Sequence, residues 1–316
     1  MRTLRPSLPA KVDHVAAIVL LLALAWAIGG CGRSGAPGTA GGRDGRVQVV
    51  AAENFWGSIA AQLGGARARV SSVIVDPATD PHSYEPTARD ARAMARAQLA
   101  IVNGLGYDEW APRLLQASPS SARTVLDVGE RLGLHDGANP HQWYSPQSVR
   151  RVAGTIASDY ARLDPRDGAY FKRREQLFLT GGLARYNALV RQIRSRYEGT
   201  PVGYSESIFR PLGEALGLRL LTPYGFARAV ADGTEVTAAD KRTVDEQARK
   251  RQIEIWVFNR QNVTPEVQRI NDLARQARIP IATVSETLAP AGVSFQRWQT
   301  AQLEGIERAL REATGR

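Results

Sequence analysis

Four side chains in this sequence have metal-binding chemistry, two histidines and two glutamates. His82 lies in DPHSYEP and His141 in NPHQWYSP, so each imidazole directly follows a proline. Proline fixes its own backbone angle and keeps the residue before it out of the helical region, which predicts stiff, non-helical loops. Glu206 in GYSES and Glu286 in TVSET each lie at the end of a short apolar run. Two imidazoles and two carboxylates form a ligand set that suits Mn(II), Fe(II) or Zn(II).

Each of these residues also has a purely structural interpretation. The His82 loop is compatible with a solvated turn, His141 with a helix cap, and each glutamate with a salt bridge. Two further residues are candidate substitutes: His135, in a Gly-containing turn that is expected to be exposed, and Glu85, which we expect to orient its loop. The four residues together indicate a metal site much more strongly than any one of them alone.

The elements that must position these side chains follow from the apolar pattern. Eight short apolar runs predict β-strands, at residues 47–52, 70–75, 99–103, 124–128, 201–206, 218–223, 253–259 and 279–286. Helical patterns lie between many of them, and repeated strand, helix, strand order predicts parallel sheets with right-handed crossovers. Ligands of such sheets bind beyond the carboxyl ends of the strands. His82 and His141 follow the second and fourth predicted strands, and Glu206 and Glu286 end the fifth and eighth, so all four are expected at that edge.

A strand-free stretch from Ser145 to about Glu198 divides the pattern in two. Within it, residues 164–198 carry the apolar stripe of an amphipathic helix, and Gly181-Gly182 predicts an interruption because glycine weakens a helix interior. The predicted fold class is therefore α/β, with two lobes at residues 47–163 and 199–316. Each lobe has a four-stranded parallel sheet flanked by helices. A long linking helix joins the lobes, and the metal cleft lies between them.

The N-terminal residues have the character of a targeting segment. Basic residues precede the apolar run at 15–28, which is short for a membrane span but typical of a secretory signal. Cys31, the only cysteine, follows AIGG, which resembles the bacterial lipoprotein signal that is cut before a lipid-modified cysteine. The alternative is a plain signal peptide that leaves a free thiol. We expect a signal at 1–30, a glycine-rich tether at 31–46 and an exported protein, lipid-anchored to a bacterial membrane and facing the periplasm or cell exterior.

The charge of the chain does not by itself indicate a nucleic-acid partner. The formal net charge is +10, and removal of residues 1–30 takes away three basic residues and Asp13, leaving +8. Basic residues are interleaved with acidic ones along helical stretches such as DKRTVDEQARKRQ, which is typical of solvated helix faces. We expect no nucleic-acid binding, and we expect a monomer.

Several pieces of the sequence together resemble a known family. They are AAENFWGSIAAQLGG, DPHSYEPTARDARAMARAQLAIVNGLGYDEW, NPHQWYSPQSVRRVA, SESIFRPLGEALGL and IPIATVSETLAPAG. The chain is similar to the solute-binding lipoproteins of bacterial ABC importers for zinc, manganese and iron, of the metal-binding cluster A-I type. This resemblance implies that His82 and His141 are ligands from the N-terminal lobe. It places Glu206 where members use Glu or His and Glu286 where they use an acidic residue, and it implies transfer of the ion to a membrane permease driven by an ATPase.

Departures from the family pattern bear on the ion. Asn139 stands where many members have Asp before the second Pro-His, and the chain has only three histidines after Cys31, with no histidine-rich loop. The carboxylate-rich site resembles the manganese or iron branch more than the zinc branch. One Mn2+ ion is therefore the favoured ligand. Zn2+ and Fe2+ are alternatives, since zinc usually binds N/O sites more tightly than manganese.

Two other function classes remain open from the residues alone. An exported metallohydrolase would use the same kind of His and Glu site with one open position. The chain has no HExxH helix, GxSxG elbow or phosphate-binding loop, so we expect a binding protein and no enzyme. A surface adhesin whose metal is only stabilising is the third class. Metal-dependent growth of a deletion strain distinguishes an importer from an adhesin.

Overall fold

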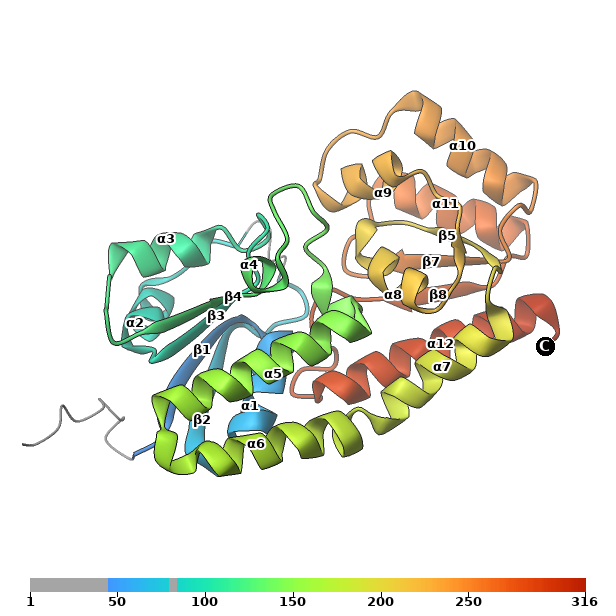
Figure 1. Ribbon diagram of the computed structural model, residues 1–316. Helices are drawn as coiled ribbons and strands as arrows, with labels where there is room; N and C mark the ends of the chain where they lie inside the picture. Colours follow the sequence, from blue (N-terminus) through green and yellow to red (C-terminus); the bar gives the residue numbers. More distant parts are fainter. Residues whose placement is uncertain (1–44, 80–83) are drawn as a thin grey trace, which may run out of the picture. The chain divides into compact units, whose positions relative to one another are not determined.

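The computed structural model describes residues 45–79 and 84–316, so the signal segment, Cys31 and His82 lie outside the described residues. The described chain forms two parallel sheets of four strands each, as predicted (Figure 1). The strands are β1 (Val47–Glu53), β2 (Ala68–Ile74), β3 (Leu99–Val102), β4 (Thr124–Asp127), β5 (Pro201–Tyr204), β6 (Arg219–Leu220), β7 (Ile255–Asn259) and β8 (Ile281–Val284). The α/β fold class read from the apolar pattern is confirmed.

The first sheet has the order β2-β1-β3-β4, with all pairs parallel. Strand β1 lies inside the sheet, where Val49 is opposite both Val70 and Leu99. Its side chains alternate between the two faces: Val49 packs in the same core as α1 and α5, and Val50 in the core formed with α2 and α3. Both faces are covered, which is why the strand is apolar at consecutive positions.

Helices on the two faces of this sheet come from the crossovers and from the segment that follows it (Figure 1). They are α1 (Asn54–Gly64), α2 (Ala88–Arg96), α3 (Trp110–Ala117), α4 (Val128–Leu132) and α5 (Pro146–Leu163), with short 3-10 turns η1 (Gly65–Arg67) and η2 (Gln142–Tyr144). Helix α1 ends before Gly65, whose positive φ of 51° is a backbone angle that glycine adopts readily. Helices α3 and α4 are additions to the elements predicted from the sequence.

The strand-free segment folds as a chain of helices that runs along the lower side of both sheets in Figure 1. After α5 come η3 (Pro165–Asp167), α6 (Gly168–Leu177), the π-helical segment η4 (Phe178–Gly182) and α7 (Ala184–Tyr197). The π-helical segment contains Gly181 and Gly182, the place where an interruption was predicted. Helix α6 packs against α5 and α1, whereas α7 packs against the C-terminal helix α12 (Phe295–Thr314). One continuous segment therefore contacts helices of both sheets.

The second sheet repeats the topology of the first, with the order β6-β5-β7-β8. Its other helices are η5 (Ser207–Phe209), α8 (Arg210–Ala215), α9 (Tyr224–Ala231), α10 (Ala238–Arg249) and α11 (Pro265–Gln276). The prediction of a strand over 218–223 was wrong in length, because β6 has only two residues. Thr222 instead accepts a hydrogen bond from the backbone N–H of Tyr204 through its hydroxyl, and α9 starts directly after Pro223. Thr237 and Thr264 directly precede α10 and α11, and their side chains cap these helices.

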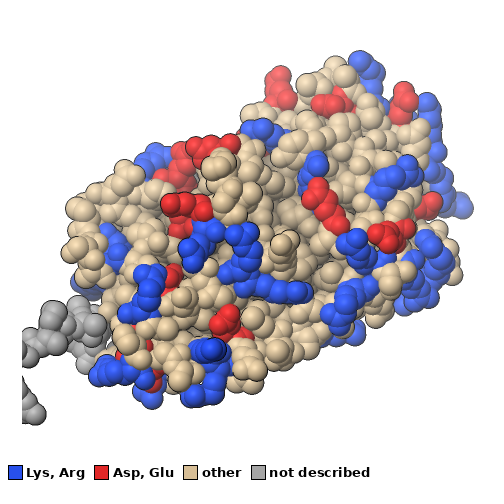
Figure 2. Space-filling view, viewed as in Figure 1, with Lys and Arg blue, Asp and Glu red and all other residues tan. Residues whose placement is uncertain are grey.

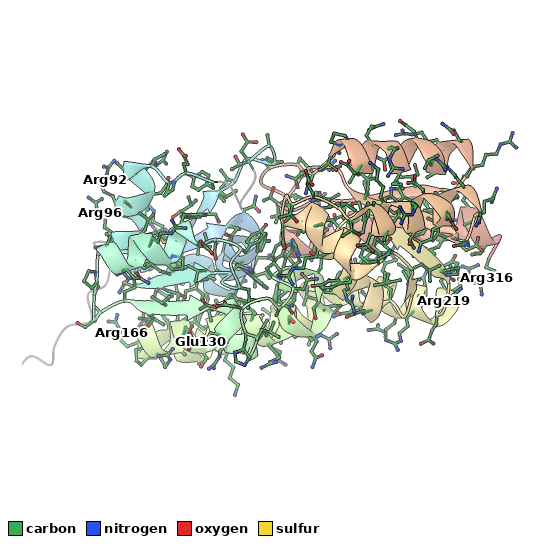
Figure 3. All side chains as sticks on the ribbon, turned by 90° about the horizontal axis from the view of Figure 1, so that it is seen from above. Arg92, Arg96, Glu130, Arg166, Arg219 and Arg316 are labelled. Carbon is green, nitrogen blue, oxygen red and sulfur yellow. The ribbon has the colours of Figure 1, made fainter. Side chains whose placement is uncertain are left out.

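The surface of the described chain is charged in both signs. Figure 2 shows Lys and Arg spread over the face in view, with Asp and Glu between them. Arg92 and Arg96 on α2 lie at one end of the view in Figure 3, Arg219 and Arg316 lie at the other end, and all four residues are exposed. Of the helices in the described residues, none has the length and apolar character that a membrane crossing requires.

Candidate metal centre

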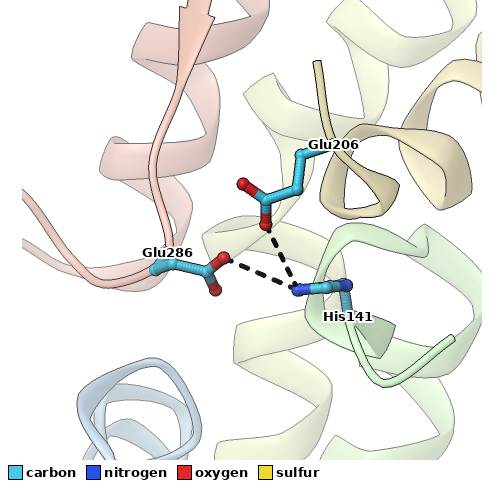
Figure 4. Close-up of side chains that lie close together, drawn as sticks. All are labelled: His141, Glu206 and Glu286. Atoms are coloured by element: carbon cyan, nitrogen blue, oxygen red, sulfur yellow. Dashed lines mark ion pairs between the residues drawn. The ribbon is translucent and has the colours of Figure 1, made fainter. Parts of the chain in front are cut away.

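Three of the four predicted ligands meet at one buried point (Figure 4). His141, Glu206 and Glu286 each offer one ligand atom, and these three atoms lie within 4.8 Å of one another. The Nε2 atom of His141 is 3.5 Å from Glu286 Oε1 and 3.9 Å from Glu206 Oε1. The exposed fractions of the three residues are 0%, 1% and 5%, so all three polar groups are removed from bulk water. His82 lies outside the described residues.

The parallel sheets bring these residues together by the position of their strand ends. Glu206 comes two residues after β5, and Glu286 comes two residues after β8, so both strands end slightly earlier than predicted. His141 directly precedes η2 (Gln142–Tyr144), in the loop that follows the first sheet. Glu206 and Glu286 therefore lie just beyond the carboxyl ends of their strands, and His141 approaches them from the loop after α4.

Hydrogen bonds fix which ring nitrogen of His141 points toward the carboxylates. Its Nδ1 is 2.7 Å from Asn139 Oδ1, which also accepts the backbone N–H of His141 at 3.0 Å. The amide of Asn139 is oriented by its Nδ2, which donates to the Ser207 carbonyl at 2.7 Å. Asn139 Oδ1 can only accept, so Nδ1 carries the proton and Nε2 presents a lone pair to Glu206 and Glu286. An imidazole held in this way has the orientation of a metal ligand.

Aromatic side chains pack around the His141 ring. Trp143 and Tyr107 lie edge-on to it, with centroid distances of 5.2 Å and 5.8 Å. Trp143 in turn stacks on Phe55 of α1 at 3.9 Å, with an interplanar angle of 16°. These rings are buried, and they connect the position of the imidazole to the core beneath the first sheet.

Amide and phenol donors hold the two carboxylates. Asn259, the last residue of β7, donates through Nδ2 to Glu206 Oε2 at 2.9 Å and to Glu286 Oε1 at 3.2 Å. Asn262 donates to Glu206 Oε2 at 3.2 Å. Tyr107 OH, from the first half of the chain, donates to Glu286 Oε2 at 2.8 Å. Each carboxylate is therefore oriented through hydrogen bonds that reach it from other elements.

Burial dominates the protonation of the centre. It lowers the pKa of His141 to about 4, with Glu206 the largest opposing influence, so the imidazole is neutral near pH 7. Burial and then the neighbouring Glu286 raise the pKa of Glu206 well above its ordinary value. Two carboxyl groups and a neutral imidazole therefore face one another in a low-dielectric space, where a divalent cation would favour the ionised form of the carboxyl groups.

A cavity of about 610 Å3 borders the centre at Glu286. Its described lining includes Asn262 and Gln261, and the exposed residues Asp232 and Arg260. Because exposed residues line it, this cavity connects the neighbourhood of Glu286 with the surface.

The remaining sequence candidates take no part in this cluster. His135 and Glu85 are exposed, and the group of metal-capable side chains found among the described residues contains neither. The supporting residues Tyr107, Asn259 and Asn262 were not predicted to bind the carboxylates. Sequence position could have identified two of them. Tyr107 follows β3 and Asn259 ends β7, and these strand ends belong to the edge where the site lies.

A comparison with protein families matches residues 49–309 to the family described as "Zinc-uptake complex component A periplasmic", ZnuA. The match spans nearly all of the described chain. The chain belongs to this family. Membership agrees with the resemblance seen in the sequence and with a fold of two parallel four-stranded sheets.

Relatives of this ZnuA-family chain are named for binding different metals. It is 28% identical over 205 residues to the manganese-binding lipoprotein MntA of Halalkalibacterium halodurans, an alignment that covers 63% of this chain and 66% of the relative. It is 23% identical over 252 residues to the iron-binding protein YfeA of Yersinia pestis, covering 77% and 71%. The chain thus spans about two thirds of the length of the first of these relatives.

Solved structures share the fold of this ZnuA-family chain. The solute-binding protein FpvC of Pseudomonas aeruginosa in complex with Mn2+ superposes with a TM-score of 0.69 at 19% identity. The superposition covers 84% of this chain and 99% of that one. This likeness shows the fold, and the assignment of ligands in the present chain rests on its own residues.

Proposed function

We propose that this protein is the solute-binding component of a metal ABC importer, which captures one divalent transition-metal ion at His141, Glu206 and Glu286. This proposal depends on one observation: the three side chains are buried, and one ligand atom of each lies within 4.8 Å of the ligand atoms of the other two. We include His82 as the fourth ligand on the basis of the sequence. Mn2+, Zn2+ and Fe2+ all accept such nitrogen and oxygen ligands, and the named relatives include manganese and iron binders.

Capture and release suit this centre better than catalysis. Two carboxylates neutralise a divalent charge, which lowers the cost of holding the ion away from water. The ion would then pass to a membrane permease powered by an ATPase. We propose that the protein acts in this way as a monomer without enzymatic activity, with lobes at 47–163 and 199–316 joined by the linking helix at 164–198.

Binding by variants tests the ligand assignment. His141→Ala and Glu206→Gln in the full chain, solubilised in detergent and stripped with chelator, should keep the fold and lose tight binding of Mn2+ and Zn2+ in calorimetric titration. His135→Ala and Glu214→Gln are matched controls, since both residues are exposed and lie outside the cluster. Wild-type affinity in both site variants would remove the two residues from the site.

Anchoring needs a separate test, because Cys31 lies outside the described residues. We propose that lipid on Cys31, after cleavage of residues 1–30, tethers the protein through residues 31–46 to the membrane. Cys31→Ala should move the protein from the membrane fraction to the soluble fraction of the host. A variant that is retained in the membrane fraction as fully as the wild type would contradict lipid attachment at this cysteine.

A further inference from the structure

The two oxygens of Glu206 have different surroundings. Oε1 faces His141 Nε2 at 3.9 Å. Oε2 accepts two amide hydrogen bonds, from Asn259 Nδ2 at 2.9 Å and from Asn262 Nδ2 at 3.2 Å. A carboxylate oxygen has two lone-pair positions, so two donors occupy both of those on Oε2.

Other hydrogen bonds fix the orientation of both amides. Asn259 Oδ1 accepts the backbone N–H of Gln261 at 3.0 Å, which leaves Nδ2 as the group that points toward the carboxylates. Asn262 Nδ2 donates its second hydrogen to the Val230 carbonyl at 3.0 Å. Turning either amide over would replace a donor by an acceptor and face two oxygens against each other. The two hydrogen bonds to Oε2 are therefore built into the loop after β7.

Glu286 accepts hydrogen bonds on both of its oxygens. Its Oε1 accepts one from Asn259 Nδ2 at 3.2 Å, and its Oε2 accepts one from Tyr107 OH at 2.8 Å. The pair of amide donors from Asn259 and Asn262 converges on Oε2 of Glu206.

We propose that Asn259 and Asn262 limit Glu206 to coordination through Oε1 alone, and that this lowers the number of ligands the site offers. The inference rests on the proposed function and deepens it by naming the class of ion. Zinc is readily held by four ligands, whereas Mg2+ requires octahedral geometry and Mn2+ suits octahedral oxygen-rich sites. The amide pair thus favours ions that accept four or five ligands and selects against those that need six.

Removal of one donor tests this assignment. In Asn262→Ala, Oε2 of Glu206 regains a lone pair and can coordinate, which raises the ligand number. Changes of residues that orient metal ligands typically alter affinity by about 10–100-fold. We expect the ratio of Zn2+ to Mn2+ affinity, measured by competitive titration of the full chain, to fall by about tenfold or more.

A spectroscopic measurement makes the test independent of affinity. Four- and five-coordinate Co2+ absorbs visible light more strongly than six-coordinate Co2+, so the Co2+-loaded variant should absorb more weakly than the loaded wild type. Asn262→Ser, whose side chain is too short to replace the amide, is a second variant. Asn187→Ala is the matched control, since its amide contacts Arg150 away from the centre.

The outcomes separate this inference from the proposed function. If the wild type binds the ions and both Asn262 variants keep its affinity ratio and Co2+ spectrum, the role of the amides is overturned and the binding function stands. If the wild type binds none of the ions, or His141→Ala binds them unchanged, the proposed function and this inference are both overturned.

Discussion

Asn103 and Asn259 lie at equivalent places in the two sheets, at the carboxyl ends of β3 and β7. Asn103 accepts the indole N–H of Trp56 and donates to the Pro140 carbonyl at 3.1 Å, directly before His141. Asn259 instead donates to the carboxylates of Glu206 and Glu286. The first half therefore positions its imidazole through ring packing and through Asn139, which contacts the ring nitrogen that faces away from the carboxylates. The second half instead donates hydrogen bonds to the ligating carboxyl groups themselves.

The difference follows from the chemistry of the ligands. A neutral imidazole has apolar faces, so buried aromatic rings can hold it in place at no cost in unpaired charge. A buried carboxylate needs donors on its oxygens, because an unpaired charge in the interior is expensive. Two sheets of the same topology thus support two kinds of ligand by different means.

The largest expected effect comes from the ring packing of the first half. Trp143→Ala removes the ring that stacks on Phe55 and borders His141, and such truncations of buried aromatics cost about 3–5 kcal/mol of unfolding free energy. Denaturant titration of the metal-free full chain measures this loss. Trp143→Phe keeps an aromatic ring and should recover most of it. Equal losses in both variants would mean that ring packing is not what holds this loop.

Substitution of Asn103 and Asn259 is the next test. The comparison predicts that one substitution mainly lowers stability and the other mainly lowers metal affinity. Asn259→Ala removes donors from both carboxylates and should weaken Zn2+ binding by about 10–100-fold. Asn103→Ala leaves the Trp56 N–H and the Pro140 carbonyl without this partner, and should cost about 1–3 kcal/mol of stability with a smaller change in affinity. Calorimetry and denaturant titration on both variants measure the two quantities. If both variants lost Zn2+ affinity and unfolding free energy in the same proportion, the proposed difference between the two asparagines would be wrong.

Acidic residues of the first half should give the chain a distinct pH dependence. Burial and then Asp108 raise the pKa of Glu53 well above its ordinary value, and burial raises the pKa of Asp108 to about 6. A raised carboxyl pKa contributes stability that is complete below the unfolded value of about 4 and is lost as the pH rises through the folded value. These two carboxyl groups should therefore lower the unfolding free energy of the metal-free protein as the pH rises above 5, while the lowered pKa of His141 contributes in the opposite direction up to its unfolded value of about 6.5.

Glu53→Gln isolates this contribution, because the amide imitates the neutral carboxyl at every pH. The variant should be more stable than the wild type at pH 8, and this advantage should shrink toward pH 4. Denaturant titration at several pH values provides the measurement, with the exposed Glu304→Gln as control. Parallel curves for Glu53→Gln and wild type would show that Glu53 ionises alike in the folded and unfolded chains.

The smallest effect is expected where α1 and α12 meet. Gln62 and Gln296 exchange amide hydrogen bonds of 3.0 Å and 2.7 Å, and both side chains are partly exposed. Water can replace either partner, so Gln296→Ala should change the unfolding free energy by no more than about 0.5 kcal/mol. A loss of several kcal/mol in denaturant titration would show that this contact between the two halves is more than an exposed polar pair.

Much of the scaffold was predictable from local pattern. Eight apolar runs marked eight strands, and the glycine pair at 181–182 marked the π-helical segment. The weakest prediction was β6, where the apolar residues of 218–223 divide between a two-residue strand and the approach to α9. A short apolar run does not distinguish a strand from a buried loop or helix, because a continuous run shows neither the two-residue repeat of a strand nor the 3.6-residue repeat of a helix.

The sequence alone determined the α/β order and the positions of Glu206 and Glu286 near strand ends, because apolar periodicity is local and parallel strands end at a common edge. Only the tertiary structure decided which nitrogen of His141 faces the carboxylates and which donors hold each oxygen. Asn259 and Glu206 are 53 residues apart, and Tyr107 and Glu286 are 179 residues apart. Hydrogen bonds over such separations depend on how the packed elements place each side chain, and no local pattern encodes that.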